Sequence, residues 1–516
     1  MNIVVAGIVM KVVLVNPPRS CDDLEEIAPP LGLLRLAAVA DELGAIVYVE
    51  DYNLLWHLDP ALRANFYEAA VQRLSALDAD IYGFTSMAVD SHVAIELGRR
   101  LKAERSQSIV VVGGSHFSSI AATVRDAFPW IDHVVEGEGE QKFGELLQSH
   151  FGGGKPLMTM ESVPAPLYGV VWLEAYFHLN PRRMANIEAG RGCRFKCSFC
   201  YSPTHYRTVR DFSNREVIGE LERAYALGFK HMWFVEDNFL NHPDRAIQLC
   251  REIRDANIGV TWSCYATFPQ LSFDVVDEMA AAGCTEVFSG IDAVGTASER
   301  AFKKAFLRGK TSLEVRLRYL KDAGITPTCA FLLSPPSHSA GRDFDQTIST
   351  AIEARCAGAE VLLNPLCLYT KTGAHETFSP RFQADSLQAR LMMDLPAVVA
   401  NNPWADVHPE LFPFHSRYVD EAEWHEFLSI CHCLSTLVQT YALTLRAIED
   451  SARFRPSHLA HTVLESYNGW ELLSGRQRRQ VEQDVGFFVL ESAASGTSAA
   501  AVLGQERGSK LSVSGL

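Results

Sequence analysis

Apolar runs alternate with amphipathic segments over the first 150 residues of the chain. Runs rich in Val, Ile and other apolar residues predict strands within residues 11–18, 46–51, 80–87, 109–116 and 133–140. Apolar residues at helical spacing between these runs predict helices over 31–44, 61–77, 91–104 and 118–128. Strands and helices that alternate in this way form a parallel sheet with helices on both faces. We therefore expect an α/β, doubly wound, Rossmann-like domain over residues 1–150.

A second alternating pattern begins after residues 151–185, a stretch rich in Gly and Pro that we interpret as a linker. Strands are predicted within residues 184–193, 231–239, 261–268, 286–293, 326–336 and 360–369, with helical segments between them. Six β/α steps with short connections predict a partial (β/α)6 barrel over residues 186–380.

Beyond residue 380 the pattern becomes helical. Residues 421–448 carry apolar positions at helical spacing, and we assign 381–492 to a mainly helical carboxyl-terminal domain. Residues 493–516 are small, polar and rich in Gly and Ser, so we expect this tail to be disordered.

Composition and charge narrow the function classes. The chain has 516 residues, of which 47% are hydrophobic, and a formal net charge of −15, which argues against nucleic acid as the main partner. No apolar run reaches the roughly 18 residues of a membrane span, and the first residues lack the features of a signal peptide. We therefore expect a cytoplasmic protein in which the 12 cysteines are not used for disulfides.

Three of these cysteines, Cys193, Cys197 and Cys200, lie within eight positions in the segment RGCRFKCSFCYSPTHYR. Zinc is one interpretation, but structural zinc prefers four ligands; a second knuckle is missing nearby, although His205 could complete the set. The other interpretation is a cubane iron–sulfur cluster, whose fourth iron would keep an open coordination position. The segment follows the first barrel strand at its carboxyl end, where barrel enzymes place their active sites.

The pattern Cys193-x3-Cys197-x-Phe199-Cys200 resembles the signature of the radical S-adenosylmethionine (SAM) superfamily. The resemblance implies that the three thiolates hold a 4Fe-4S cluster, that SAM chelates the fourth iron, and that Phe199 lies near the adenine. WFVEDNF (residues 233–239) and FSGIDA (288–293) resemble the second- and fourth-strand motifs of this superfamily, with Asp292 where relatives usually have Glu. We also assign Ser263, on the third strand, to the SAM site.

The amino-terminal segments NPP, PPLG, VVVGGSH and EGEGE resemble the cobalamin-binding domain that precedes the barrel in one class of radical SAM enzymes. The resemblance implies that the ends of the strands line the cofactor. The matching residues are Pro17, Pro18, Thr85, Ser86, Gly113, Gly114, Ser115, His116, Glu136 and Gly137. The D-x-H-x-x-G motif that supplies an axial histidine in other cobalamin proteins is incomplete at Asp90-Ser91-His92, because Ile95 replaces the glycine. We therefore expect no protein histidine below the cobalt.

The resemblance implies a methyltransferase that moves a methyl group from methylcobalamin to an unactivated carbon of a small-molecule or peptide natural product. It also implies an electron donor of the ferredoxin or flavodoxin type. Two other functions stay open: a cobalamin-binding radical SAM enzyme that cyclises or rearranges its substrate without methylation, and a non-catalytic cofactor-binding module. Candidate catalytic residues at the strand ends are Glu236, Asp237, Tyr265 and Tyr369. An aromatic loop with Trp404, His408, Phe412, Phe414 and His415 could cover the substrate.

Overall fold

The computed structural model describes residues 10–19, 27–151, 163–304, 312–335, 341–378, 382–392 and 401–451. The expected disordered tail and the chain after residue 451 lie outside the described residues. Contacts divide the chain into two compact units. Unit 1 comprises Met1–Tyr265, Ala281–Cys284 and Leu368–Arg417, and unit 2 comprises Ala266–Ala280, Thr285–Cys367 and Tyr418–Leu516. Within the described residues, no helix is long and apolar enough to cross a membrane.

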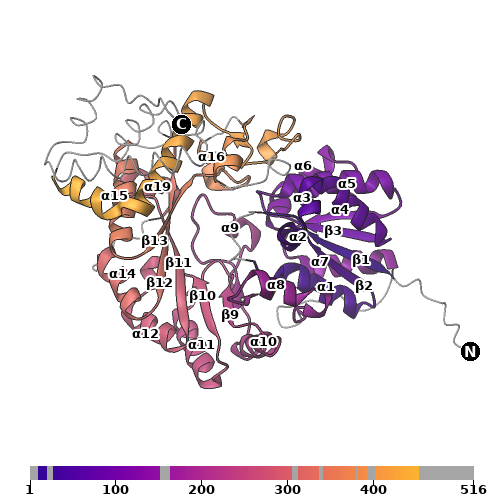
Figure 1. Cartoon of the computed structure of the whole chain (residues 1–516), viewed down its shortest axis with the longest axis horizontal. Helices are drawn as coiled ribbons and strands as arrows, with labels where there is room; N and C mark the ends of the chain where they lie inside the picture. The colour runs from indigo at the N-terminus through magenta and orange to yellow at the C-terminus, as the bar shows by residue number, and fades with distance from the viewer. Residues whose placement is uncertain are drawn as a thin grey trace, which may run out of the picture. The chain divides into compact units, whose positions relative to one another are not determined.

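Unit 1 begins with a five-stranded parallel sheet in the order β2-β1-β3-β4-β5 (Figure 1). Its strands are β1 (Lys11–Asn16), β2 (Ile46–Asp51), β3 (Ile81–Thr85), β4 (Ile109–Gly113) and β5 (His133–Val135). Four helices flank them: α1 (Leu31–Glu42), α5 (Ser91–Glu104), α6 (Ser115–Ala127) and α7 (Gly139–Phe151).

Both faces of this sheet are buried. Val13 and Val15 of β1 belong to a core cluster with residues of α5 and α6. Val12 and Leu14, on the opposite face of the same strand, belong to a second cluster with residues of α1 and α7. Because successive side chains of a strand point to opposite faces, the nearly unbroken apolar run of β1 serves both cores. The doubly wound α/β fold predicted from the sequence is confirmed.

The helix predicted over residues 61–77 is broken. The structure has α2 (Tyr52–Leu58), α3 (Pro60–Ala64) and α4 (Phe66–Ala76) in this region. Asp59 caps α3 by accepting from two backbone N–H groups, and Pro60 occupies the first turn, where its missing N–H costs nothing. Asn65 leaves the helical conformation at φ −144°, and the buried Phe66 ring then packs against Tyr52. Helical spacing did not reveal this break, because both fragments keep their apolar positions.

The segment interpreted as a linker contains structure in its described part. Helix α8 (Leu173–Leu179) follows the short 3-10 helix η3 (Tyr168–Val170). The Tyr176 hydroxyl donates to Oδ2 of Asp51 over 2.6 Å, and the side-chain amide of Asn180 donates to the carbonyl of Ile27 over 3.0 Å. Helix α8 is therefore fixed to the amino-terminal domain.

The second part of unit 1 contains the start of another parallel sheet. Strands β6 (Met184–Ile187), β9 (His231–Phe234) and β10 (Thr261–Tyr265) pair in the order β10-β9-β6. Helices α10 (Asn214–Ala226) and α11 (Pro243–Ala256) follow β6 and β9 in the chain. Shorter elements complete the unit: β7 (Gly190–Arg191), α9 (Ser202–His205), β8 (Arg210–Asp211), α16 (Gly373–Phe378), β14 (Gln383–Ala384), α17 (Leu387–Met392), η6 (Pro409–Leu411) and β15 (Ser416–Arg417).

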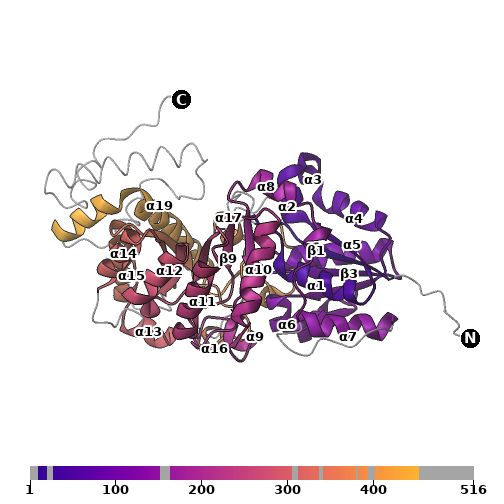
Figure 2. The same ribbon diagram turned by 90° about the horizontal axis from the view of Figure 1, so that it is seen from below.

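Unit 2 contains the later strands, β11 (Cys284–Asp292), β12 (Thr326–Leu333) and β13 (Glu360–Pro365), which are also parallel. The complete strand order is β13-β12-β11-β10-β9-β6, which agrees with the predicted six β/α steps. The helices of unit 2 are α12 (Phe273–Ala281), α13 (Thr296–Phe302), α14 (Leu313–Asp322), α15 (Gly341–Cys356) and α19 (Glu421–Ser451). Figure 2 shows α14 beside α15. The long helix α19, predicted at 421–448, packs against β13 and α15.

Candidate functional site

The three clustered cysteines lie on a loop that is closed at its base. The loop leaves β7 and returns at β8, and the two short strands pair antiparallel. Glycine is needed on the outgoing arm. A Cβ atom at Gly190 would lie 2.7 Å from Oδ1 of Asp211, and one at Gly192, where φ is +86°, would lie 2.6 Å from the carbonyl oxygen of Thr208. The two arms therefore approach so closely that only residues without a side chain fit.

Cys193, Cys197 and Cys200 do not take part in disulfides. Burial raises the pKa of the Cys200 thiol to about 12, and the negative charges of Asp237, Cys197 and Cys193 add to this effect. That mutual influence places the three sulfurs in one small region of the loop. Three cysteines outside disulfides suit a 4Fe-4S cluster, in which each thiolate binds a different iron.

A zinc ion held by the three cysteines and His205 is the other interpretation of this segment. Among the residues that the structure describes, no three His, Cys, Asp or Glu side chains lie close enough together to hold one metal ion. His205, the expected fourth ligand, instead packs edge-on against the ring of Tyr206, with the ring centres 4.5 Å apart.

Asn241 fixes the start of the cysteine loop. Its side-chain amide donates to the carbonyl oxygen of Gly192 over 2.7 Å, and its Oδ1 accepts from the backbone N–H of Arg194 over 3.0 Å. These two groups flank Cys193 on either side, and Asn241 itself is buried. The sequence analysis missed Asn241, although it lies just beyond the second-strand motif WFVEDNF.

The chain that follows β13 packs on the same loop. The backbone N–H of Ala374 donates to the carbonyl of Ser198 over 2.7 Å, and a Cβ atom at Gly373 would lie 3.3 Å from the Cβ of Ser198. Tyr369, a candidate catalytic residue, belongs to this segment and adds to the raised pKa of Tyr201. The structure therefore brings Tyr369 to the cysteine loop.

Glu236 and Asp237 follow β9 and have different partners. Oε2 of Glu236 accepts from the backbone N–H of Ala189 over 3.2 Å, and burial raises the pKa of Glu236 to about 8. Oδ2 of Asp237 accepts from the Ser202 hydroxyl over 2.6 Å, and burial raises the pKa of Asp237. Asp237 thereby links the end of β9 to α9, the helix that follows Cys200.

Two candidates on β10 are enclosed by their neighbours. Ser263 is fully buried, and its hydroxyl shares a hydrogen bond of 2.9 Å with Nε2 of His231 on β9. The Tyr265 ring packs against Trp233, with ring centres 5.5 Å apart. Phe199, the residue predicted to lie near the adenine, is half-buried between Cys197 and Cys200.

Asp292 ends β11 in unit 2. It adopts a left-handed backbone with φ +63°, which is uncommon for a residue other than glycine. Its carboxylate is buried and forms an ion pair with Lys304. Burial raises the pKa of Asp292, whereas the Lys304 charge opposes this rise. The strained backbone at the end of a barrel strand is typical of a functional position.

The glycine pair at the end of β4 is required by contact with the end of β3. Gly114 has φ +102°, and a Cβ atom there would lie 2.7 Å from the carbonyl oxygen of Ser86. The backbone N–H of Ser86 in turn donates to the carbonyl of Gly113 over 3.3 Å. The two strand ends thus form one tight edge, at which a parallel sheet receives its ligand.

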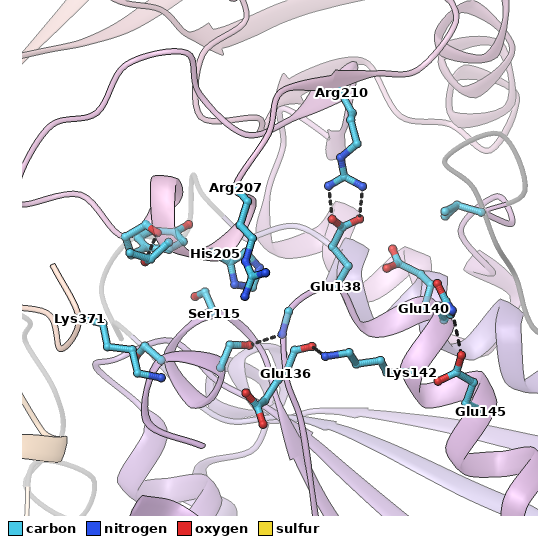
Figure 3. A pocket seen from close by; sticks show the side chains of 17 residues that line it. Ser115, Glu136, Glu138, Glu140, Lys142, Glu145, His205, Arg207, Arg210 and Lys371 are labelled. Carbon is cyan, nitrogen blue, oxygen red and sulfur yellow. Dashed lines mark hydrogen bonds and ion pairs between the residues drawn. The ribbon is translucent and has the colours of Figure 1, made fainter. Parts of the chain in front are cut away.

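A cavity of about 570 Å³ opens between that edge and the returning part of the cysteine loop (Figure 3). Three predicted cobalamin residues line it, namely Ser115, Glu136 and Gly137. A Cβ atom at Gly137 would meet no atom within 4 Å, so this turn leaves open space. The opposite wall, which sequence reasoning missed, consists of Tyr201, Thr204, His205, Arg207 and Arg210, with Lys371 beside it. Room of this kind at the sheet edge fits part of a corrinoid, and these residues would hold it.

Other predicted cobalamin residues do not line this cavity: Pro17, Pro18, Thr85, Ser86, Gly113, Gly114 and His116. His116 is buried, and its Nε2 donates to the carbonyl of Leu411 over 2.8 Å. Burial lowers the pKa of His116 to about 4, so the ring is neutral. His92 is also buried, with its ring 4.4 Å from that of His415.

The aromatic loop expected over a substrate is divided: the Phe414 ring lies 6.2 Å from the ring of Tyr369, whereas other side chains of the loop pack on the amino-terminal domain. Trp404 contacts Phe128 and Trp130, with ring centres 5.5 and 5.2 Å away. Phe412 belongs to the core cluster of the amino-terminal sheet. Trp404 and Phe412 therefore pack against the amino-terminal domain, because burying apolar surface is favourable, and the substrate cover stays a prediction.

A buried ion-pair network joins the amino-terminal domain to the base of the cysteine loop. Arg191 on β7 is only 5% exposed and forms ion pairs with Glu138 (2.9 Å), Glu140 (2.5 Å) and Glu188 (3.0 Å). Glu138 also pairs with Arg210 on β8. Glu138 and Glu140 lie directly after the cavity residues Glu136 and Gly137. Their ion pairs therefore connect the predicted cobalamin site to the base of the loop that carries the predicted cluster site.

Comparison with known protein families agrees with both predicted domains. The radical SAM superfamily matches residues 187–349, and the B12 binding domain matches residues 21–147. Both predictions are confirmed.

Individual relatives are more distant. Over 311 residues, the chain is 27% identical to an uncharacterized methyltransferase of Pyrococcus horikoshii, which covers 55% of this chain and 66% of that protein. Over 303 residues, it is 24% identical to the anaerobic magnesium-protoporphyrin IX monomethyl ester cyclase of Rubrivivax gelatinosus, covering 52% of this chain and 53% of that enzyme. The chain thus spans less than two thirds of each relative's length.

A solved structure has the same fold. The radical SAM methyltransferase TsrM from Kitasatospora setae, with cobalamin and a 4Fe-4S cluster bound, superposes with a TM-score of 0.57 at 17% identity, covering 88% of this chain and 99% of that one. The cofactors implied by the two domains are the 4Fe-4S cluster, SAM and cobalamin. The chain therefore contains a B12 binding domain ahead of a radical SAM domain, and a methyltransferase is among its relatives.

Proposed function

We propose that this protein is a methyltransferase that transfers a methyl group to an unactivated carbon of a small-molecule or peptide substrate. The observation that carries the proposal is the cavity whose walls come from both cofactor regions. One wall holds Glu136 and Gly137 from the B12 binding domain, and the other holds Tyr201 and His205 from the chain just after Cys200. A site built in this way suits a reaction that needs both cofactors at one substrate.

The bound cofactors would supply the radical and the methyl group, and the residues of this chain would hold and orient them. Cys193, Cys197 and Cys200 would bind the cluster, and Asn241 would fix the backbone around the first of them. Glu236 has a pKa of about 8, so it is protonated and uncharged at neutral pH. It can therefore retain a proton beside the loop without adding negative charge to the site.

Asp237 has a positioning role in this scheme. It accepts from the Ser202 hydroxyl, and this contact orients the chain that leaves Cys200 toward the cavity. Tyr201 is buried there, and burial raises its pKa well above the ordinary value of 10, so the phenol stays neutral. A neutral phenol adds no charge to this part of the cavity wall. The residues proposed for the SAM site, Phe199, Ser263 and Asp292, remain assignments from the resemblance.

A non-methylating cyclisation is the second candidate, because one of the relatives is a cyclase. Product mass distinguishes the two reactions: methyl transfer adds one CH2 unit, whereas cyclisation does not. The ferredoxin- or flavodoxin-type donor and the cytoplasmic location also remain predictions.

The experiment is anaerobic reconstitution with iron, sulfide and cobalamin, followed by reduction in the presence of SAM. We expect both 5′-deoxyadenosine and S-adenosylhomocysteine, and the Cys197→Ala variant should lose the former. Deoxyadenosine without S-adenosylhomocysteine would favour cyclisation over methyl transfer. Cobalamin binding with neither product would identify a non-catalytic module and would contradict the proposal.

A further inference from the structure

Two cations in the cavity lack a described partner. The side chains of Arg207 and Lys371 both line it (Figure 3), and neither forms a hydrogen bond or an ion pair with any residue that the structure describes. Arg207 lies on the returning arm of the cysteine loop, and Lys371 precedes α16. The two positions are far apart in sequence, yet the contact between Ala374 and Ser198 ties the second segment to the first.

The carboxylates around the cavity do not need these cations. Glu136 pairs with Arg125, Glu138 with Arg191 and Arg210, and Glu140 with Arg191. The fourth, Glu145, accepts from the side-chain amide of Gln141 over 2.8 Å. Each acid therefore has a partner other than Arg207 and Lys371, and the positive charges of these two residues are left facing the cavity.

The backbone at both cations is strained. Arg207 has φ +58° and Lys371 has φ +66°, a left-handed conformation that costs a side-chain-bearing residue about 1–2 kcal/mol. Neither position is a glycine, which would remove that cost. Strained non-glycine residues cluster at sites where a particular side chain is required. Two of them, both cationic, border one cavity here.

We propose that Arg207 and Lys371 form a binding site for an anionic oxygen group, a phosphate or a carboxylate, of the ligand that enters this cavity. A guanidinium offers a planar pair of donors to such a group, and an ammonium adds a compact point charge. The anion has two possible sources, the phosphodiester in the nucleotide tail of cobalamin or an acidic group on the substrate. The identification of these two sources rests on the proposed function. The anion site itself rests on the positions of Arg207 and Lys371 in the cavity.

The test uses the full-length, anaerobically reconstituted protein and the double variant Arg207→Gln/Lys371→Gln. The matched control, Arg63→Gln/Lys321→Gln, removes the same charge from two exposed side chains outside the cavity. Three probes are titrated: cobalamin, cobinamide (a corrinoid that lacks the phosphodiester) and inorganic phosphate, the last by 31P NMR line width. Melting temperatures check that every variant is folded.

We expect the cavity variant to bind an anionic probe at least about tenfold more weakly than wild type, which is equivalent to about 1.4 kcal/mol. The control variant should bind it as wild type does. A loss for cobalamin but not cobinamide assigns the site to the cofactor phosphodiester. A loss for inorganic phosphate alone, with both corrinoids unchanged, assigns it to an acidic group of the substrate. Unchanged binding of all three probes, or an equal loss for cobalamin and cobinamide, would overturn the proposal. Wild-type protein that binds phosphate but neither corrinoid would refute the proposed function and leave the anion site standing.

Discussion

Asn241 shows how a single side chain can control a ligand that it does not touch. Its amide bridges the carbonyl of Gly192 and the N–H of Arg194, the two groups on either side of Cys193. A side chain bonded on both sides of a residue restricts its backbone conformation, and with it the direction of the Cys193 thiolate. Asn241 is therefore a positioning residue for the proposed cluster.

We expect Asn241→Ala to lower the stability of the cysteine loop and to speed the loss of iron from the bound cluster. The substitution leaves two backbone groups without their partner, and each unsatisfied buried group costs about 1–3 kcal/mol. Melting temperature and the rate of iron release to a chelator report the effect. The control is Asn214→Ala, because the one hydrogen bond of that side chain within the described part of the chain goes to Glu252 on a neighbouring helix. Equal iron-release rates in wild type and Asn241→Ala would refute the positioning role.

Glu236 predicts a pH dependence of stability. Burial raises its pKa from 4.5 to about 8 in the folded protein. Below pH 4.5 this carboxyl group is protonated in both the folded and the unfolded chain, so it does not change the stability there. As the pH rises from 4.5 to about 8, the unfolded chain releases a proton that the folded chain retains, so stability falls.

The variant Glu236→Gln removes this titration and should be more stable than wild type near pH 8, by up to a few kcal/mol because one pKa unit is about 1.4 kcal/mol. The two proteins should converge near pH 5. Melting temperatures measured across this range provide the test, with the exposed Glu174→Gln as control. A constant difference at every pH would show that the carboxyl group does not titrate in this range.

At the scale of elements, the turn from β4 to α6 depends on a close approach of two strand ends. Alanine at Gly114 would combine a left-handed backbone with a Cβ atom 2.7 Å from the carbonyl oxygen of Ser86. Alanine at Gly44, at the end of α1, has the same backbone problem at φ +83°, but its Cβ atom would meet nothing within 4 Å.

We therefore expect Gly44→Ala to lower the free energy of unfolding by about 1–2 kcal/mol and Gly114→Ala to lower it by clearly more. The difference measures the contact with β3, because both variants carry the same backbone strain. Urea denaturation followed by circular dichroism gives both values. Equal losses would mean that the strand ends separate without cost.

The elements themselves were largely predictable because each strand is a short apolar run with turn-forming residues beside it. The exceptions have local causes. Helix α8 lies among prolines and glycines that favoured a linker, yet Tyr176 and Asn180 fix it through partners more than 100 positions earlier in the chain. Sequence periodicity carries no information about such distant hydrogen bonds.

The site was predictable only where a motif exists. The cysteines have a recognisable spacing, and in the structure the charges of Cys193 and Cys197 act on Cys200. The turn at Glu136-Gly137 also belongs to a recognisable motif, and it lines the cavity. Asn241, Arg207 and Lys371 are ordinary loop residues in the sequence, and their roles follow from contacts that only the folded chain creates. His116 follows the glycine pair at which the edge of the corrin was expected. Its ring instead bonds to the carbonyl of Leu411, almost 300 positions away in the sequence.

For the whole molecule, we expect cobalamin binding to be independent of cluster binding. Cobalamin at about 100 times its Kd should stabilise the folded protein by about 2.7 kcal/mol if it binds only that state. The same stabilisation is expected in Cys197→Ala, because the cavity wall from the B12 binding domain does not involve that thiol. Thermal shifts with and without cobalamin test this in both proteins. A shift that disappears in Cys197→Ala would show that corrinoid binding requires an intact cluster loop.

The ion pairs around Arg191 have a consequence for how the chain can be divided. Two of the three carboxylates that neutralise this enclosed guanidinium belong to the amino-terminal domain. A fragment that starts at the barrel would keep Glu188 as the one remaining partner of Arg191 and would lose the other two carboxylates, and breaking a buried ion-pair network in this way is destabilising. The barrel fragment is therefore expected to be less stable alone than in the full chain, and a chimera with a different amino-terminal domain should need acidic residues at the positions of Glu138 and Glu140.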